Sequence, residues 1–328
     1  MPDPILPSAR WAVFGAGVIS GDFARALRHA RLGGLHAVAS RDTARAEAFA
    51  AEHGAPIVGG YDDILTRNDI DAVYIGTVHT THVELATAAL EAGKAVLCEK
   101  PLGVSVAETE ALIGHAERTG LPLVEAFKYR FGPFPERMRQ LIADDELGDV
   151  LEIESSIGFD AGDRTGRLFD PETAGGAILD AGCYPVSLAV GVAAWAGRLG
   201  AVSVVEAEGV VGTVDEQASA VLDLDGIRAR VRTAITADLP RRAVIRGTRG
   251  ELEVPNVWGS RTASTDTAIL RRVDGTSERV TADVVQPMAA EADATVLALR
   301  EGRTQTPEMP WFETLATARL LADWRAAL

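Results

Sequence analysis

The sequence has few of the features that mark secreted and membrane proteins. Its 2 cysteines, Cys98 and Cys183, are too few for a secreted disulfide scaffold, and we expect both to be buried free thiols. No apolar run approaches the roughly 18 residues of a membrane helix, so no membrane partner is expected. Residues 1–7 lack a basic stretch followed by an apolar one, so a signal peptide is not predicted. These absences favour a cytoplasmic protein.

Positive charge is also in deficit. The chain contains 47 Asp and Glu against 32 Lys and Arg, which gives a formal net charge of −15. Such a surface repels phosphate backbones, so nucleic acid is not an expected partner. Hydrophobic residues make up 47% of the 328 residues. The chain can therefore bury a large core, and its length favours two domains.

Strands and helices alternate in the first third of the sequence. Strands are predicted at short apolar runs, and helices where apolar residues recur at three- and four-residue spacing. Apolar strands joined by helices are typical of a parallel sheet covered on both faces. Residues 1–126 are therefore predicted to form a doubly wound α/β domain of the Rossmann type. Its predicted strands are 10–14, 35–39, 72–75, 95–98 and one that begins at 123.

After residue 126 the pattern changes to alternation of apolar and polar residues. Residues 150–159 and 216–225 each alternate, and a turn at Asp225-Gly226 is predicted to lead into a strand over 227–236. One long helix is predicted over 176–195. Residues 127–328 are therefore predicted to form a second, α+β domain for substrate binding and oligomerisation, built on a large open, mostly antiparallel sheet. The final helix, 314–328, is compatible with packing on either domain.

A glycine-rich loop follows the first predicted strand directly. The sequence Gly15-Ala16-Gly17-Val18-Ile19 lies between that strand and the first predicted helix. In this context Gly15 permits a tight turn and Gly17 lets the backbone approach a pyrophosphate. The helix N-terminus supplies free N–H groups and a partial positive charge. Ser20 stands where a third glycine is usual and is small enough for close helix–strand packing. These five residues are the predicted dinucleotide-binding loop.

The end of the second predicted strand indicates which nicotinamide cofactor is used. An NAD site usually has an acidic residue there for the ribose hydroxyls, but this strand ends in Ala39-Ser40-Arg41-Asp42. Ser40 and Arg41 can bind a 2′-phosphate by hydrogen bond and charge, and Asp42 is better placed to cap the next helix. The sequence therefore favours NADP over NAD. The alternative is that Arg41 is only a solvated surface charge.

Four later segments resemble those of one family. They are Cys98-Glu99-Lys100-Pro101, Glu125-Ala126-Phe127-Lys128-Tyr129-Arg130, the stretch Arg167–Glu172 leading into Gly175–Pro185, and Glu301-Gly302-Arg303 before Pro307. In this order they resemble the glucose–fructose oxidoreductase/inositol dehydrogenase (Gfo/Idh/MocA) family, in its sugar and dihydrodiol dehydrogenase branch. The resemblance covers nearly the whole chain.

Three of these residues have the chemistry that alcohol oxidation requires. The reaction needs a base for the hydroxyl proton; a lysine ammonium lowers the pKa of a nearby phenol, and a carboxylate can orient the substrate. We predict Tyr184 as general acid/base, Lys100 as its electrostatic partner that also binds the substrate oxygen, and Asp180 as the residue that positions substrate. Inositol dehydrogenase-like members have histidine at the position of Tyr184. Alternatively, Lys100 is a solvated charge and Tyr184 a core residue.

Further site residues are predicted around this set. Thr77, His79 and His82 follow the strand 72–75, and the resemblance places their loop and Glu99 against the nucleotide. No third ligand accompanies the two histidines, so no metal site is predicted.

Substrate-pocket candidates come from the second domain. They are Arg130, Arg167 and Phe159. For the two arginines, ion pairing with Glu125 and Asp170 respectively is an equally good interpretation.

The predicted function is NADP-dependent oxidation of a hydroxyl group on a sugar or related cyclic polyol. An aldose resembling xylose or glucose is the first choice, and dihydrodiol oxidation or ketosugar reduction comes next. The hypothesis from another class is a regulatory protein that binds a dinucleotide without turnover. A homodimer or homotetramer through an exposed apolar face of the second domain's sheet is also expected, since large exposed apolar faces usually mark interfaces.

Overall fold

A computed structural model describes residues 8–260 and 262–328. The N-terminal segment for which no signal peptide was predicted lies outside the described residues. The chain divides into two compact units. Unit 1 comprises the chain up to Leu102, Glu110–Lys128 and Val285–Pro310, and unit 2 comprises Gly103–Thr109, Tyr129–Val284 and Trp311–Leu328.

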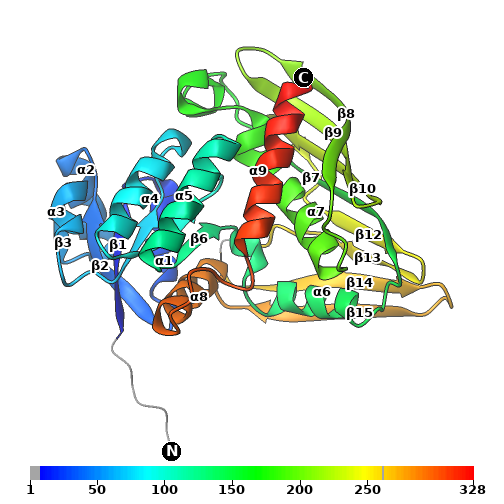
Figure 1. The fold of residues 1–328 in the computed structure, drawn as a ribbon, viewed down its shortest axis with the longest axis horizontal. Coiled ribbons are helices and arrows are strands. Elements are labelled where there is room, and N and C mark those ends of the chain that lie inside the picture. Colours follow the sequence, from blue (N-terminus) through cyan, green and yellow to red (C-terminus); the bar gives the residue numbers. More distant parts are fainter. Residues whose placement is uncertain (1–7, 261) are drawn as a thin grey trace, which may run out of the picture. The chain divides into compact units, whose positions relative to one another are not determined.

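Unit 1 contains a parallel six-stranded sheet in the order β3-β2-β1-β4-β5-β6 (Figure 1). This confirms the predicted Rossmann domain. The strands at the centre of the sheet are almost completely buried, because helices cover both faces and the sequences are apolar throughout. The strands are β1 (Ala9–Phe14), β2 (Gly33–Ala39), β3 (Ile57–Gly59), β4 (Ala72–Ile75), β5 (Ala95–Glu99) and β6 (Leu123–Ala126).

The crossover helices α2 and α5 each begin at a polar capping side chain. Asp42 caps α2 by accepting a hydrogen bond from the backbone N–H of Arg45 at 3.1 Å, as predicted. At α5, the Ser105 hydroxyl accepts from the Glu108 N–H at 3.2 Å. The crossover helices are α1 (Val18–Ala26), α2 (Thr43–His53), α3 (Tyr61–Leu65), α4 (His82–Glu91) and α5 (Val106–Thr119).

Helix α8 (Pro287–Arg300) corrects the predicted domain division. The sequence assigned everything after residue 126 to the second domain, but Val285–Pro310 belongs to unit 1. The Asp293 carboxylate accepts hydrogen bonds from the backbone N–H groups of Arg31 and Leu32 at 2.8–3.0 Å. The Arg300 side chain donates to the Leu32 carbonyl at 3.3 Å. These contacts fix α8 beside β2, whereas the final helix belongs to unit 2.

Unit 2 contains a nine-stranded sheet in the order β15-β14-β13-β12-β7-β10-β9-β8, with β11 also paired to β7 (Figure 1). All of its neighbouring strands are antiparallel except β10 and β7. This confirms the predicted large, mostly antiparallel sheet. The strands are β7 (Val150–Asp160), β8 (Val202–Val211), β9 (Asp215–Leu224), β10 (Ile227–Ala234), β11 (Thr236–Leu239), β12 (Ala243–Gly247), β13 (Gly250–Val254), β14 (Ser264–Arg272) and β15 (Ser277–Val284).

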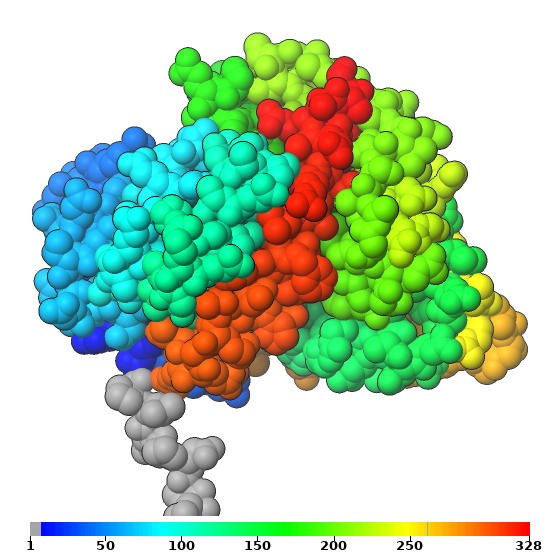
Figure 2. All heavy atoms as spheres, in the orientation of Figure 1, coloured from blue at the N-terminus to red at the C-terminus, as the bar shows by residue number. Residues whose placement is uncertain are grey.

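Helices cover one face of this sheet. Figure 2 shows α9 along the surface of unit 2. The predicted helix over 176–195 is a π-helical turn, η5, followed by an α-helix, α7. Short 3-10 turns precede it at Arg167–Phe169 and Pro171–Thr173. The longer helical elements are α6 (Pro133–Ala143), η5 (Ile178–Gly182), α7 (Cys183–Trp195) and α9 (Trp311–Ala326).

The segment Pro171–Trp195 is long and apolar enough, by length and composition alone, to cross a membrane. The sequence analysis expected no run of this kind. Within the described residues, 89% of its most apolar window is buried inside the protein. A buried core helix of a soluble protein passes the same test, so the finding is only weak evidence for a membrane span.

The opposite face of the sheet differs from the predicted apolar surface. Arg246 of β12 contacts Glu152 and Glu154 of β7 at 3.2 and 3.0 Å and Glu251 of β13 at 2.9 Å. Arg230 of β10 lies 3.2 Å from Glu152. We call these five residues the charge ladder. It forms because arginines and glutamates alternate in register on the strand positions that point away from α7.

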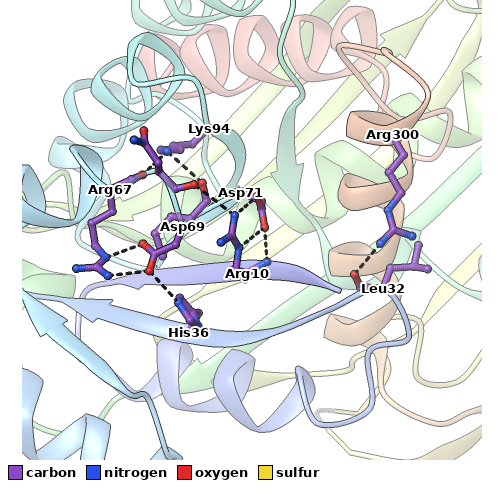
Figure 3. A network of polar contacts seen from close by, with 10 residues as sticks. Arg10, Leu32, His36, Arg67, Asp69, Asp71, Lys94 and Arg300 are labelled. Atoms are coloured by element: carbon purple, nitrogen blue, oxygen red, sulfur yellow. Dashed lines mark hydrogen bonds and ion pairs between the residues drawn. The ribbon is translucent and has the colours of Figure 1, made fainter. Parts of the chain in front are cut away.

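A second polar network ties together the amino ends of the Rossmann strands (Figure 3). Arg10 makes a two-pronged contact with Asp71 at 2.9 and 3.0 Å. Arg67 makes a similar contact with Asp69, at 2.7 Å for both bonds. The buried Lys94 ammonium donates to the carbonyl of Arg67 at 2.6 Å. In open α/β sheets ligands bind at the carboxyl ends of strands, so this network is structural.

Candidate functional site

The glycine loop lies between β1 and α1, as the sequence predicted. Gly15 has φ +91°, a conformation that glycine adopts without strain. A Cβ added at Gly17 would meet no atom within 4 Å, and the Val18 side chain is 78% exposed. Gly17 is the N-cap of α1, with extended backbone and no side-chain cap. The loop therefore leaves open space in front of free helix N–H groups, which suits a pyrophosphate. Ala16 and Ile19 complete this loop.

Ser20 lets helix α1 pack closely on the sheet. Its side chain is fully buried, and its hydroxyl donates to the Gly76 carbonyl at 3.4 Å. A Cβ at Gly76 would overlap the Ser20 hydroxyl. A serine is thus accepted in place of the third glycine because the facing residue is itself a glycine. Gly76 was not predicted as a site residue, although its position directly after β4 was a usable signal.

Ser40 and Arg41 follow the end of β2, at the same carboxyl edge of the sheet. Arg41 is exposed, and its positive charge lowers the pKa of Tyr61 against the larger effect of burial, which raises it. Arg45, which was not predicted as a site residue, donates to the Ala16 carbonyl at 3.4 Å. The Arg45 guanidinium therefore lies beside the glycine loop, and the Arg41 guanidinium lies near Tyr61.

The loop after β4 holds Thr77, His79 and His82, which have different environments. The Thr77 hydroxyl accepts a hydrogen bond from Thr81 at 2.7 Å. The His82 ring is fully buried, with its nitrogens 2.9 Å from the Pro101 carbonyl and 3.3 Å from the Thr77 carbonyl. His82 therefore joins this loop to the loop after β5, and we assign it to holding the loops in place. His79 is also buried.

A cluster of buried ionisable side chains lies around Glu99, the residue before Lys100. Glu99 ends β5 and accepts a hydrogen bond from the Tyr74 hydroxyl at 2.7 Å. Burial raises the pKa of Glu99, while the positive charges of Lys100 and Lys128 oppose that shift. Glu291 of α8 is completely buried and faces Glu99 and Lys128. We call Tyr74, Glu99, Lys128 and Glu291 the acid cluster. Of these residues Glu99 interacts electrostatically with Lys100, which directly follows β5.

Asp180 and Tyr184 lie at the start of the long buried helix of unit 2. Asp180 is in η5 and Tyr184 in the first turn of α7. The Asp180 carboxylate accepts a hydrogen bond from Arg167 at 2.9 Å. The alternative partner predicted for Arg167 was Asp170, which instead caps the next turn through the Glu172 N–H. A π-helical turn at this position widens the helix, and such turns are frequent at functional sites.

Aromatic side chains hold the ring of Tyr184. Its centroid lies 5.8 Å from that of Tyr129 and 5.6 Å from that of Trp258. The Trp258 indole N–H donates to the Ser156 carbonyl at 2.8 Å, and the Tyr129 hydroxyl donates to Ser187 at 3.1 Å. Burial raises the pKa of Tyr129 to about 12, so it stays protonated. Neither Tyr129 nor Trp258 was predicted as a site residue.

Arg130 does not suit the predicted substrate pocket. Its side chain is 1% exposed and lies 2.5 Å from the Glu313 carboxylate. It also donates to the Ser187 carbonyl at 3.2 Å and lies over the ring of Trp195. We therefore assign Arg130 to the packing of unit 2. Its partner is Glu313 of α9 and not the predicted alternative, Glu125.

Phe159 also contributes to packing. It is half-buried against a cluster formed by Phe169, Ala177, Val214 and Ile235. Among residues 8–260 and 262–328, no group of three or more His, Cys, Asp or Glu side chains is arranged to hold a metal ion.

Glu291 and Lys128 are the acid-cluster residues that sequence analysis missed. Glu291 stands on the buried face of α8, three residues after Met288 and four before Thr295. That helical spacing placed a charged residue among buried ones and was a usable signal. Lys128 lies within the motif 125–130 that had been singled out for its resemblance.

Comparisons with known proteins agree with the two-part fold described above. Residues 9–127 match the model of an oxidoreductase family with an NAD-binding Rossmann fold, and residues 136–253 match the Gfo/Idh/MocA C-terminal domain. A trans-1,2-dihydrobenzene-1,2-diol dehydrogenase of Xenopus tropicalis is 32% identical, over 96% of each chain. A D-xylose 1-dehydrogenase (NADP(+)) of Haloferax volcanii is 34% identical, over 87% of this chain and 86% of that one.

Solved structures show the same architecture. KijD10, a 3-ketoreductase from Actinomadura kijaniata crystallised with TDP-benzene and NADP, aligns over 98% of both chains with a TM-score of 0.84 and 26% identity. An aldose-aldose oxidoreductase of Caulobacter crescentus aligns with a TM-score of 0.86 at 22% identity, which supports the fold alone. The family models together span most of the chain, and the protein is therefore a member of the Gfo/Idh/MocA family of oxidoreductases.

Proposed function

We propose that this protein is an NADP-dependent dehydrogenase that oxidises a CH–OH group of a sugar or related cyclic polyol. The observation that carries the proposal is the position of Lys100, directly after the strand β5 in a family oxidoreductase fold. The similarity to diol and xylose dehydrogenases over most of the chain supports the substrate class. An aldose such as D-xylose or D-glucose is our first choice.

The chain supplies the proton chemistry of this reaction. In the proposal, the Tyr184 phenolate takes the hydroxyl proton of the substrate, and the Lys100 ammonium stabilises the phenolate and binds the substrate oxygen. Asp180, held by Arg167 at 2.9 Å, orients the sugar through a neighbouring hydroxyl. When bound, the oxidised nicotinamide supplies the hydride acceptor. The proposal requires Lys100 and Tyr184 to act on the same substrate oxygen.

Removal of either group tests these roles. Tyr184→Phe and Lys100→Met should each lower kcat by roughly 10²–10⁴-fold, because proton transfer is lost. Lys100→Arg keeps the positive charge and serves as the matched control, with a smaller loss. Near-normal turnover in both Tyr184→Phe and Lys100→Met would overturn the assignment.

We assign NADP as the cofactor on the strength of Ser40 and Arg41. Arg45, beside the glycine loop, adds a second guanidinium that can meet the 2′-phosphate. Thr77 and His79 follow the carboxyl end of β4, where the family's nucleotide is expected. Arg41→Ala should raise KM for NADP and leave KM for NAD unchanged. The control is Arg28→Ala, which replaces an exposed arginine in the turn after α1. A wild-type preference for NAD would contradict the assignment.

A substrate panel distinguishes the remaining choices. Reduction of NADP is followed by absorbance at about 340 nm with D-xylose, D-glucose, cyclic polyols and a trans-dihydrodiol. Two alternatives within this class rest on the relatives: dihydrodiol oxidation on the Xenopus enzyme, and ketosugar reduction on KijD10. A protein that binds NADP but turns over no member of the panel in either direction would favour a regulatory role.

We also propose a homodimer or homotetramer through the exposed sheet of unit 2. The charge ladder supports it, because alternating arginines and glutamates can pair with themselves across a two-fold axis. Light scattering measures the mass directly, and a monomer at micromolar concentration would contradict the proposal. A cytoplasmic location is supported by the buried free thiols Cys98 and Cys183.

A further inference from the structure

The helix that carries Asp180 and Tyr184 begins without a capping side chain of its own. The residue at its N-cap position is Ala177, which provides no side-chain acceptor. The first backbone N–H groups of a helix have no partner within it and need an acceptor from elsewhere. Here the acceptor comes from the first residue of β9, since the Ile178 N–H donates to the Asp215 carboxylate at 2.6 Å.

The surrounding backbone is shaped to admit this carboxylate. Gly176 has φ +111°, and a Cβ at that position would overlap the Asp215 carboxylate. Burial raises the pKa of Asp215, while the backbone N–H groups of Ile178 and Ala177 oppose that shift by stabilising the ionised carboxylate. From the adjacent strand β10, the buried Thr233 hydroxyl donates to the Ala177 carbonyl at 3.2 Å. Two strands of unit 2 therefore hold the peptide groups on either side of Ala177.

The geometry points to Asp215 as a positioning residue for the reaction. We infer that its carboxylate fixes the start of the helix and thereby the directions in which Asp180 and Tyr184 point. Asp180 lies two residues after Ile178 and Tyr184 six, so a change in the first turn moves both. A displacement of about 1 Å in a reacting group can cost roughly 100-fold in rate. This inference rests on the proposed roles of Asp180 and Tyr184.

Removing the acceptor should affect turnover more than cofactor binding. In Asp215→Ala the two N–H groups lose their acceptor, and we expect kcat to fall about 10- to 100-fold. The affinity for NADPH, measured by fluorescence, should stay within about twofold, because the glycine loop belongs to unit 1. Asp215→Asn keeps an oxygen that accepts the Ile178 N–H, and we expect it to retain most of kcat.

Asp274→Ala is the matched control. Asp274 is also in unit 2 and also accepts a backbone N–H, from Thr276 at 2.8 Å, but in the turn between β14 and β15. It should leave kcat unchanged. If Asp215→Ala fails to fold, Asp215→Ser and Gly176→Ala, which disturb the same contact, replace it and should show the same fall in kcat.

Tyr184→Phe, measured in parallel, separates the inference from the proposed function. If Tyr184→Phe loses turnover but every folded variant of the Asp215 contact keeps it, the inference is wrong and the proposed function stands. If Tyr184→Phe keeps turnover, the role of Tyr184 fails, and the inference fails with it. An equal loss in Asp215→Asn and Asp215→Ala would also overturn it, because the hydrogen bond would not be the cause.

Discussion

Unit 2 pairs the buried acid Glu313 with a base, whereas in unit 1 the buried acid Glu291 has no hydrogen-bond partner among the described residues. In unit 2 the Glu313 carboxylate lies 2.5 Å from the buried Arg130 guanidinium. In unit 1 neither carboxyl oxygen of Glu291 has a hydrogen-bond partner among the described residues, although the side chain is completely buried. A buried carboxylate keeps its charge only if a partner compensates it; otherwise it keeps its proton.

The contrast extends to the neighbours of each acid. Burial raises the pKa of Glu291 well above its ordinary value, the negative charge of Glu99 adds to the effect, and Lys128 opposes it. Burial is also the main reason that the pKa of Tyr74 lies well above its ordinary value, and the negative charges of Glu99 and Glu291 raise it further. We therefore expect Glu291 to keep its proton, while Glu99 is the acid of this pair whose ionised form is favoured by the positive charges of both Lys100 and Lys128.

Removing one partner of the pair in unit 2 should have the largest effect on stability. Glu313→Gln leaves Arg130 as an uncompensated buried charge, which costs about 3–5 kcal/mol. Urea unfolding followed by tryptophan fluorescence is a suitable measurement, because Trp195, Trp258 and Trp324 all lie in unit 2.

The double variant Arg130→Met/Glu313→Leu tests the explanation. It removes both charges and should recover most of the lost free energy of unfolding, since apolar replacements of a buried ion pair are often neutral or stabilising. A double variant as unstable as Glu313→Gln would mean that packing, and not the unpaired charge, caused the loss.

The acid cluster of unit 1 should make the free energy of unfolding depend on pH. Below the ordinary glutamate pKa of about 4.3 both folded and unfolded chains hold the Glu291 proton. Above it the unfolded chain releases that proton while the folded chain retains it, so stability falls by about 1.4 kcal/mol per pH unit until the raised pKa is reached. Glu291→Gln removes this loss.

The free energies of unfolding of Glu291→Gln and wild type should therefore diverge as pH rises. Urea titrations at several pH values measure the difference, and the carbonyl infrared band of a protonated acid should disappear in the variant. A difference that does not change with pH would show that Glu291 ionises normally in the folded protein.

The two units also differ in how much of their structure the sequence predicts. The strands β1, β2, β4, β5 and β6 were predictable because each contains a short apolar run, and the glycine loop because it directly follows β1. Strand β3 (Ile57–Gly59), which is only 3 residues long, was not predicted. The return of helix α8 to the first unit was not predicted, because the contacts that hold it there are remote: the Asp293 carboxylate accepts a hydrogen bond from the backbone of Arg31, 262 residues away. No local pattern indicates that such a segment returns to the first unit.

The same limit applies to the site in unit 2. Asp180 and Tyr184 were predicted from motif order, and their helix from its apolar sequence. The cap of that helix was not, because a capping residue is normally sought next to the first turn, whereas Asp215 lies 37 residues after Ile178. Arg130 likewise pairs with Glu313, 183 residues away, whereas the sequence offered a place in the substrate pocket or, equally, an ion pair with the nearby Glu125.

Substitutions in the charge ladder should have the smallest effect on the free energy of unfolding, because its ion pairs are more exposed to solvent than the pair of Arg130 and Glu313. Arg246 is 36% exposed and contacts three glutamates, so water and salt screen each pair. Exposed ion pairs contribute about 0.2–1 kcal/mol each. Arg246→Gln should therefore lower the unfolding free energy by about 1 kcal/mol at low salt, and the loss should shrink toward zero near 1 M salt.

Arg232→Gln is the control for this measurement, because its cross-strand neighbour is Ser156 rather than a glutamate; it should change stability little at any salt concentration. Glu313→Gln, in contrast, should lose nearly the same free energy at low and high salt, since salt screens buried charges weakly. If the Arg246 loss proves equally insensitive to salt, the ladder is shielded from solvent. The proposed sheet-to-sheet dimer would account for that shielding, and repeating the salt titration at a protein concentration where light scattering reports monomer would then restore the salt dependence.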